Sequence, residues 1–312
     1  MATLTVSNDD EKHVKALGFL SNKGTDNFNG RVITRNGKIT AAQMRCIANA
    51  AEQYGNGQIE FTTRLTAEVA GIPYGEIENF RHYLEQENLV TGGTGAKVRP
   101  VVSCKGTTCQ FGLYDTFALS EEIHERFFVG YGDVKLPHKF KIAVGGCPNN
   151  CVKPNLNDVG IIGQRLPQLD TDKCKGCGKC AIVAACPVNA CAVRGGKMQR
   201  DTAVCTQCGR CVDKCYFNAV SAKTTGYKIV VGGRWGNQIS MGHTLGTLFT
   251  SEAEVLSMVE KVILLFRSEG YAGERLAVTL ARVGFDYAEK LLMSDELLRR
   301  KDEILAAEIK TR

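Results

Sequence analysis

The sequence of 312 residues lacks the features that mark membrane and secreted proteins. It has no run of about 18 uninterrupted apolar residues, the length that a membrane-spanning helix needs. Its most apolar stretch, Val255 to Phe266, is interrupted by Glu260 and Lys261. The N-terminal segment has no basic region followed by an apolar block, so no signal peptide is expected. We therefore predict a cytoplasmic protein with no membrane span.

Several functional motifs are also missing. The sequence has no base-reading motif and no basic run with interleaved aromatic residues, so we do not expect a nucleic-acid partner. It has no dinucleotide-binding fingerprint and no flavin motif, so direct use of NAD(P)H is not expected. The five histidines lie apart without ligand spacing. Only His138, beside Lys139, lies near another candidate functional residue.

Cysteine, by contrast, is abundant. Of the 14 cysteines, 12 fall into four clustered motifs, and only Cys46 and Cys191 lie outside them. In a reducing compartment such a content indicates metal binding rather than disulfides. The net charge of +6 is modest for this length and would suit an anionic substrate or a polycarboxylate cofactor.

Hydrophobic periodicity predicts a host fold of two parts. Strand, helix, strand and helix are expected in turn over residues 31–35, 40–55, 58–64 and 72–88. Thr40 and Gln43 have the spacing of a capping box, and this order indicates a small α+β sandwich. After a loop at 92–97, strands are expected at 97–103, 139–144, 158–163 and 227–233, and helices at 114–130, 251–270 and 285–312.

The predicted organisation is an N-terminal arm (1–26), a first unit (27–95), a second unit (96–167 and 224–312) and a cysteine-rich insertion (168–223). The insertion contains a repeat, because DTDKCKGCGKC at 170–180 and DTAVCTQCGRC at 201–211 are identical at six of eleven positions. The segments that follow also match, as CPVNA at 186–190 and CYFNA at 215–219.

The repeated cysteine motifs have the spacing of iron–sulfur ligands. Three thiolates two residues apart can bind three irons of one [4Fe–4S] cluster, while the fourth cysteine reaches the other cluster of the pair. The insertion resembles the bacterial two-cluster ferredoxins. This resemblance implies one cluster on Cys174, Cys177, Cys180 and Cys215, and another on Cys205, Cys208, Cys211 and Cys186.

Two departures from the ferredoxin pattern leave alternatives open. Five residues separate Cys180 from Cys186, and Tyr216 replaces the usual proline. Cys191 could therefore compete as a ligand, although the repeat aligns Cys186 with Cys215. A pair of zinc sites with four thiolates each is the other reading. Cys46, on the first predicted helix, is expected to pack in the core.

A second set of cysteines lies in the host fold and is preceded by a basic segment. Cys104, Cys109, Cys147 and Cys151 could hold a third cluster or a zinc ion. Lys139 and Lys141 are expected on one face of a strand, with Cα atoms roughly 6.6 Å apart. Two like charges so placed repel each other unless an anion lies between them. A solvated edge strand is the alternative.

These motifs together resemble those of the siroheme-dependent nitrite and sulfite reductases. The motif GCPNNC (146–151), with Cys104 and Cys109, is similar to the family's cluster motif. FTTR (61–64) is similar to its Thr-rich Arg segment, and LPHKFK (136–141) to the strand that supplies two active-site lysines. With its ferredoxin-like insertion, the chain most resembles the catalytic subunit type of anaerobic sulfite reductase.

The resemblance implies an α+β fold, in which a ferredoxin-like half domain precedes a siroheme/[4Fe–4S] domain that carries the inserted 2[4Fe–4S] domain. It implies a siroheme whose iron shares the Cys151 thiolate with a [4Fe–4S] cluster, so that three [4Fe–4S] clusters are expected in all. The cationic and donor side chains of Thr62, Thr63 and Arg64 are candidates for the siroheme carboxylates. The implied anion pocket maps onto Arg31, Arg99, Lys139 and Lys141.

The expected function is the six-electron reduction of sulfite to sulfide. One alternative is reduction of nitrite to ammonia by the same machinery, and another is an electron-transfer subunit without catalytic siroheme. Better-known relatives carry two copies of the unit, whereas this chain has one, so a homo-oligomer or a complex is expected. The expected electron donor is a ferredoxin or a flavoprotein subunit.

Overall fold

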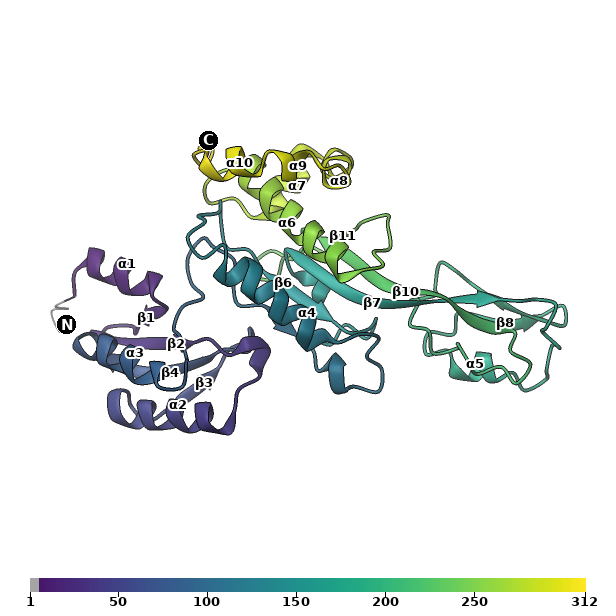
Figure 1. Cartoon of the computed structure of the whole chain (residues 1–312), viewed down its shortest axis with the longest axis horizontal. Helices are drawn as coiled ribbons and strands as arrows, with labels where there is room; N and C mark the ends of the chain where they lie inside the picture. Colours follow the sequence, from purple (N-terminus) through teal and green to yellow (C-terminus); the bar gives the residue numbers. More distant parts are fainter. Residues whose placement is uncertain (1–5) are drawn as a thin grey trace.

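The computed structural model describes residues 6–312. Along its long axis lie a small N-terminal unit, a central unit that carries the C-terminal helices, and a narrow arm (Figure 1). Within the described residues, no helix is long and apolar enough to cross a membrane.

The N-terminal unit is a four-stranded antiparallel sheet with helices packed against it. The strands, in sheet order, are β1 (Phe19–Ser21), β2 (Asn27–Val32), β4 (Ala67–Pro73) and β3 (Ile59–Phe61). The helices are α1 (Asn8–Ala16), α2 (Ala41–Tyr54) and α3 (Ile77–Glu85). Thr40 and Gln43 form the predicted capping box, and α2 ends at the predicted Gly55. Cys46 is buried in this core, as expected.

The N-terminal segment differs from the prediction of a loosely ordered arm. Residues 8–16 form α1, and β1 joins the sheet by pairing with β2. Ser7 caps α1 by accepting a hydrogen bond from the Asp10 N–H, and Val14 is buried. The polar composition of this segment did not predict α1, because the helix contributes only one buried side chain to the core. The first five residues of the predicted arm lie outside the described part.

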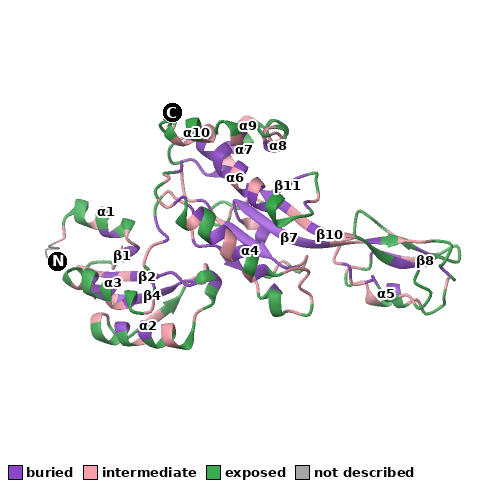
Figure 2. Cartoon of the chain, viewed as in Figure 1, coloured by how far each residue is buried: buried purple, intermediate pink, exposed green. Residues whose placement is uncertain are grey.

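The central unit is built on a five-stranded mixed sheet. In sheet order the strands are β11 (His243–Thr244), β10 (Val220–Val231), β7 (Val159–Leu169), β6 (Ile142–Gly145) and β5 (Val102–Ser103). Strands β5, β6 and β7 run parallel, whereas β10 is antiparallel to both of its neighbours. Figure 2 shows that buried residues concentrate in this sheet and in the long helix α6.

Helices surround the central sheet. They are α4 (Thr116–Ile123), a π-helix (His124–Val129), α6 (Glu252–Glu269), α7 (Leu276–Val283), α8 (Phe285–Leu292), α9 (Glu296–Arg299) and α10 (Lys301–Ala306). The predicted helix that begins after Ser251 is confirmed as α6, with a capping box from Ser251 and Glu254 and an end at Gly270. Its apolar stripe packs into the largest core of the molecule.

Strands β7 and β10 extend beyond this core as a two-stranded ribbon that carries the arm (Figure 1). The cysteine-rich arm (residues 170–219) contains α5 (Ala181–Ala185) and the hairpin of β8 (Cys191–Arg194) and β9 (Lys197–Arg200). Its small core consists largely of cysteine and aliphatic side chains. The ribbon therefore joins two separate cores.

Candidate active site

The four cysteines of the host fold are brought together by the parallel pairing of β5 and β6. Cys104 directly follows β5, and Cys147 lies two residues after β6. Because parallel strands end at the same edge of a sheet, the two loops that follow them meet. The Gly146 N–H donates a hydrogen bond to Cys104 Sγ at 3.2 Å. The sequence placed these cysteines in two distant pairs, and the sheet unites them.

Electrostatics show that all four thiols share one neighbourhood. Burial raises the pKa of the Cys147 thiol, and the thiols of Cys104, Cys151 and Cys109 raise it further. Cys151 is exposed, whereas the other three are partly buried. Three thiols close enough to raise the pKa of Cys147 can bind a cation together with it as thiolates.

The backbone around Cys147 is closely packed at two glycines, Gly146 in the same loop and Gly163 in β7. A Cβ on Gly146 would lie 3.0 Å from Gly106 Cα, and one on Gly163 would lie 2.4 Å from Gly146 O. Tyr114 donates a hydrogen bond to Gly145 O at 3.0 Å and supports the same loop. The position of Cys147 is therefore set by backbone packing.

The predicted pair of arginines also comes together, although Arg31 and Arg99 lie far apart along the chain. Both donate hydrogen bonds to the carbonyl oxygen of Gly93, Arg31 at 3.0 Å and Arg99 at 2.6 Å. Arg31 also pairs with Glu68. Burial lowers the pKa of Arg99 to about 10, and the charges of Arg31 and Arg275 contribute.

The predicted lysines lie in the same neighbourhood, but the strand that carries them was predicted too long. Strand β6 begins at Ile142, after both lysines. The Lys141 N–H donates to Asp158 Oδ2 at 2.8 Å, and so a side chain takes the place of a ladder partner. Burial, together with the charges of Arg64, Arg275 and Lys139, lowers the pKa of Lys141 to about 8.

Asp158 and Arg275 were missed by sequence reasoning. Asp158 is fully buried, and its carboxylate pairs with the Arg275 guanidinium, whose Nη2 lies 3.0 Å from Oδ2. Arg275 lies at the start of α7, 117 residues away along the chain, so no local motif indicated this pair. Its Nε is buried without a hydrogen-bond partner. The charge of Arg275 also lowers the pKa of Lys139, after the larger effect of burial.

The FTTR segment is positioned differently from the prediction of a continuous strand. Strand β3 ends at Phe61, and Thr62 turns the chain by accepting hydrogen bonds from the N–H groups of Arg64 and Thr66. The Arg64 guanidinium donates to the carbonyl oxygens of Pro100 and Ile142 and to Asn157 Oδ1 at 2.6–3.0 Å. Arg64 thus joins the N-terminal unit to the central sheet, while Thr63 is exposed.

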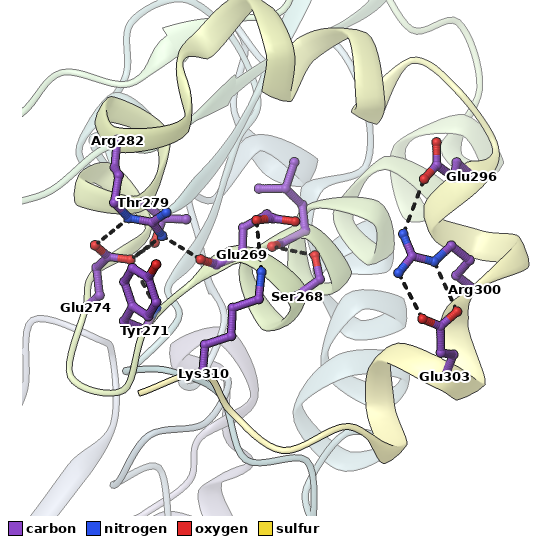
Figure 3. Close-up of polar contacts among 11 residues, drawn as sticks. Ser268, Glu269, Tyr271, Glu274, Thr279, Arg282, Glu296, Arg300, Glu303 and Lys310 are labelled. Carbon is purple, nitrogen blue, oxygen red and sulfur yellow. Dashed lines mark hydrogen bonds and ion pairs between the residues drawn. The ribbon is translucent and has the colours of Figure 1, made fainter. Parts of the chain in front are cut away.

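The loop that presents Arg275 is held by a buried carboxylate. Glu274 accepts hydrogen bonds from Thr279 Oγ1 at 3.0 Å and from the Tyr271 N–H at 3.1 Å, and it pairs with Arg282 at 2.9 Å (Figure 3). The Gly273 N–H donates to Pro137 O, next to the lysine segment. This network fixes the backbone on both sides of Arg275.

We call Arg31, Arg64, Arg99, Lys139, Lys141 and Arg275 the basic cluster. Two carboxylates, those of Glu68 and Asp158, pair with its members. Arg99 Nε, like Arg275 Nε, is buried without a partner. Arg275 is buried and the other five cations are partly buried. Such cations, in excess of their carboxylate partners and with unused donors, fit an anionic ligand with several acceptor oxygens.

In the arm, thiols gather around Cys211. Burial raises the pKa of Cys211, and Cys205, Cys208 and Cys186 raise it further. Cys186 accepts a hydrogen bond from the Ala190 N–H at 3.2 Å. This grouping is the one that the ferredoxin resemblance implies. Cys191, the possible competing ligand, is buried against Cys186, and burial with this neighbour raises its pKa to about 12.

The other four cysteines of the predicted arm clusters are Cys174, Cys177, Cys180 and Cys215. Cys174 accepts hydrogen bonds from backbone N–H groups, including that of Met198 at 3.2 Å, and these lower its pKa. Cys174, Cys180 and Cys215 contribute to the arm core, whereas Cys177 is exposed. Backbone N–H groups aimed at sulfur favour the thiolate, which is the form that binds iron.

Among residues 6–312, no three His, Cys, Asp or Glu side chains meet around the position of a single metal ion. A four-iron cluster bonds each thiolate to a different iron, so its ligands stand further apart. The donor sets described above, thiols only and supported by backbone N–H groups, fit such clusters. The basic cluster fits a polycarboxylate such as siroheme.

A cavity of about 450 Å³ lies between the N-terminal unit and the π-helix. Ile33, Leu89, His124 and Phe128 contribute to its lining. None of the predicted site residues lines it.

Two family models match the chain. The model of the nitrite and sulphite reductase 4Fe-4S domain matches residues 94–299, and that of the nitrite/sulfite reductase ferredoxin-like half domain matches residues 21–87. Together they cover both units of the fold.

Among similar proteins is the coenzyme F420-dependent sulfite reductase of Methanocaldococcus jannaschii, 35% identical over 83% of this chain and 40% of its own length. Another is a subunit of the anaerobic sulfite reductase of Salmonella typhimurium, 32% identical over 53% of this chain and 52% of its own length. The chain therefore spans only about half, or less, of the length of these two relatives.

Solved structures share the fold. Dissimilatory sulfite reductase I aligns with a TM-score of 0.68 and 22% identity, over 91% of this chain and 72% of that one. The NirA protein of Mycobacterium tuberculosis aligns with a TM-score of 0.64 and 16% identity, over 99% of this chain and 49% of that one.

Proposed function

The chain belongs to the nitrite and sulfite reductase family, and from this premise we propose that it reduces sulfite to sulfide by six electrons. The family consists of oxidoreductases and implies a siroheme and an iron–sulfur cluster. The observation that carries the proposal is the basic cluster, which gathers six cations from both units of the fold beside the start of β6, while the loop that carries Cys147 follows the end of the same strand.

The four-thiol set of Cys104, Cys109, Cys147 and Cys151 would hold the cluster next to siroheme, with Cys151 as the shared ligand. Siroheme, when bound, would supply the redox-active iron at which the oxyanion accepts electrons. Its carboxylates would pair with members of the basic cluster. Thr62, Thr63 and Arg64 remain the proposed carboxylate contacts, and Arg275 is a further candidate.

Arg31, Arg99, Lys139 and Lys141 would hold the oxygens of sulfite. Each oxygen leaves as water, so protons must arrive together with the electrons. An ammonium Nζ can give its proton to a departing oxygen and take another from solvent. The guanidinium groups cannot release protons at neutral pH, so they bind and stabilise charge. A lysine pKa of about 8, as for Lys141, suits repeated proton transfer.

The arm would relay electrons on two further clusters. We propose one on Cys174, Cys177, Cys180 and Cys215, and the other on Cys205, Cys208, Cys211 and Cys186. Residues 168–223 would then form an inserted ferredoxin domain between the two parts of the siroheme domain, 96–167 and 224–312. The half domain would span 27–95.

Nitrite is the second candidate substrate. It is also a small oxyanion, and the same cations would bind it. A relative of this chain over 128 residues, from Emericella nidulans, is named nitrite reductase [NAD(P)H]. Reduction would then yield ammonia. We propose sulfite first because the Methanocaldococcus and Salmonella relatives, which match longer stretches of this chain, are named sulfite reductases.

We further propose that the protein acts in the cytoplasm as a homo-oligomer or as part of a complex, with a ferredoxin or a flavoprotein subunit as electron donor. The Salmonella relative is named as a subunit. A complex would complete a cofactor site that one copy of the unit leaves open.

The visible spectrum and iron content of anaerobically purified protein test the proposal. We expect siroheme bands that shift on addition of sulfite, and about 13 irons per chain, from three four-iron clusters and one siroheme. A larger shift with nitrite than with sulfite would favour the second substrate. An iron–sulfur shoulder without siroheme bands would overturn the reductase and favour an electron-transfer subunit.

A further inference from the structure

The second cysteine motif of the arm lies directly against the four-thiol set. Cys147 and Cys208 line the same small cavity, of about 200 Å³. Arg165, in β7, forms an isolated parallel bridge with Cys208, and its N–H donates to Gln207 O at 2.8 Å. A cysteine of one set thus approaches a cysteine of the other.

The second arm motif packs closely against Arg165 at this junction. Gly209 has a φ of +69°, and a Cβ there would lie 2.6–2.8 Å from carbons of the Arg165 side chain. The Arg165 guanidinium also pairs with Asp213 at 2.8 Å, on the far side of the motif. Arg165 therefore holds residues 207–213 from two sides, and only glycine fits at the closest point.

One side-chain contact spans the junction itself. The Arg210 guanidinium lies over the Phe111 ring, 4.0 Å from its centroid. Phe111 follows Cys109 by two residues, and Arg210 directly precedes Cys211. A cation–π contact at this distance is favourable, and it ties a ligand loop of one set to a ligand loop of the other.

The internal repeat shows that this arrangement is specific to one copy. Lys179 occupies the position in the first copy that Arg210 occupies in the second. Lys179 is exposed and lines an open depression with Cys180 and Val183, on the arm surface. The two motifs have the same cysteine spacing, but only the second lies beside Cys147.

Resting on the function proposed above, we propose that Phe111 and Arg210 form a clasp that positions the second arm motif for electron transfer. A low-potential one-electron reductant, such as dithionite, would reduce the iron held by the arm. One electron would then pass from iron held with Cys208, which would be oxidised, to iron held with Cys147, which would be reduced. No bond breaks and no proton moves. The Arg210 charge also offsets repulsion between two groups of thiolates.

The test uses the holoprotein with three changes: Arg210→Gln, Phe111→Leu and both together. The control is Lys179→Gln, the same loss of charge at the equivalent position of the other copy. Electron paramagnetic resonance of the dithionite-reduced protein reports the magnetic coupling of neighbouring reduced clusters. Hydrogen exchange at the Arg165 N–H reports whether the junction opens.

We expect unchanged iron content, weaker coupling between clusters, and exchange at Arg165 faster by about fivefold in each single variant. The double variant should add little, because both changes remove the same contact. The control should leave coupling and exchange as they were.

Unchanged coupling and exchange in all three variants, or equal changes in Lys179→Gln, would overturn the clasp. Neither readout needs siroheme or substrate. Failure of the reductase proposal would instead appear in the spectrum and turnover of the unaltered chain, so the two failures are distinguishable.

Discussion

The Arg275 guanidinium lies 3.0 Å from the Asp158 carboxylate, and both side chains are buried. Asp158 also accepts the Lys141 N–H, so this one carboxylate orients a predicted active-site lysine and an arginine from a distant helix. Removing one partner of a buried pair leaves the other charge uncompensated. We expect Arg275→Gln to lower the free energy of unfolding by about 3 kcal/mol.

Urea unfolding of the ligand-free chain measures this loss. The matched control is Arg234→Gln, because Arg234 is only partly buried and bonds to Gln238 in a surface turn. The control should change the free energy of unfolding by less than about 0.5 kcal/mol. Equal losses in the two variants would contradict a special role for the Asp158 pair.

The two lysines carry the second prediction. In the holoenzyme, Lys139→Ala and Lys141→Ala should each lower turnover by about a hundredfold or more, because each removes a proton donor and a charge that binds the oxyanion. Iron and siroheme content should stay the same. Lys135→Ala is the control, since Lys135 is exposed four residues before Lys139. Near-normal turnover in either lysine variant would remove that residue from the site.

The sequence predicted the residues of the site better than the geometry that unites them. Local signals located the Thr40–Gln43 capping box, the arm's cysteine repeat and the Lys139–Lys141 segment, because each depends on neighbours along the chain. Asp158 and Arg275 gave no such signal, since they lie 117 residues apart along the chain and meet only in the folded structure. The strand through Lys139 was predicted too long for the same reason: Asp158 replaces a ladder partner.

The repeat illustrates a further limit of the sequence. Its two copies match so closely that nothing in them indicated which lies beside the host cysteines. The answer depends on Arg165, in the ribbon, and on Phe111, in a loop of the central unit. Both residues are ordinary in their local sequence.

Gly163 provides a prediction about the cysteine loops. A methyl group there would lie 2.4 Å from Gly146 O and 2.9 Å from Tyr114 Cε1, so the loop that carries Cys147 must shift. Gly163→Ala should cost about 1–3 kcal/mol in stability and reduce iron bound per chain. Gly75→Ala is the control, because nothing lies within 4 Å of its added methyl. Full iron content in Gly163→Ala would show that the loop tolerates the shift.

Lys141 should make stability depend on pH. Its folded pKa is about 8, lowered from 10.5 first by burial and then by Arg64. Between these two values the unfolded chain binds more protons than the folded one, so stability rises with pH across this window. Below pH 8 the folded state carries the full penalty of the charged group.

Lys141→Met removes that penalty. Relative to the unaltered chain, the variant should gain most at pH 7, and the gain should shrink towards pH 10. Unfolding in urea at pH 7, 8, 9 and 10 measures the difference between the two proteins, which cancels titrations they share. A difference independent of pH would contradict a lowered pKa for Lys141 in the folded chain.

Glu274 carries the last prediction, because its network fixes the loop from which Arg275 extends. Burial alone would raise its pKa, but Arg282, the Tyr271 N–H and Thr279 lower the pKa to about 2. A folded pKa below the ordinary 4.5 stabilises the fold above pH 4.5, and this contribution is lost as pH falls towards 2. Glu274→Gln should therefore lower the free energy of unfolding by about 2 kcal/mol at pH 7 and by progressively less below pH 4.5.

Glu303→Gln is the control, since its exposed pair with Arg300 (Figure 3) is open to solvent. Equal effects of the two changes would mean that the loop does not depend on Glu274; a loss confined to Glu274→Gln, together with weaker sulfite binding by the holoenzyme, would connect the loop to the basic cluster through Arg275.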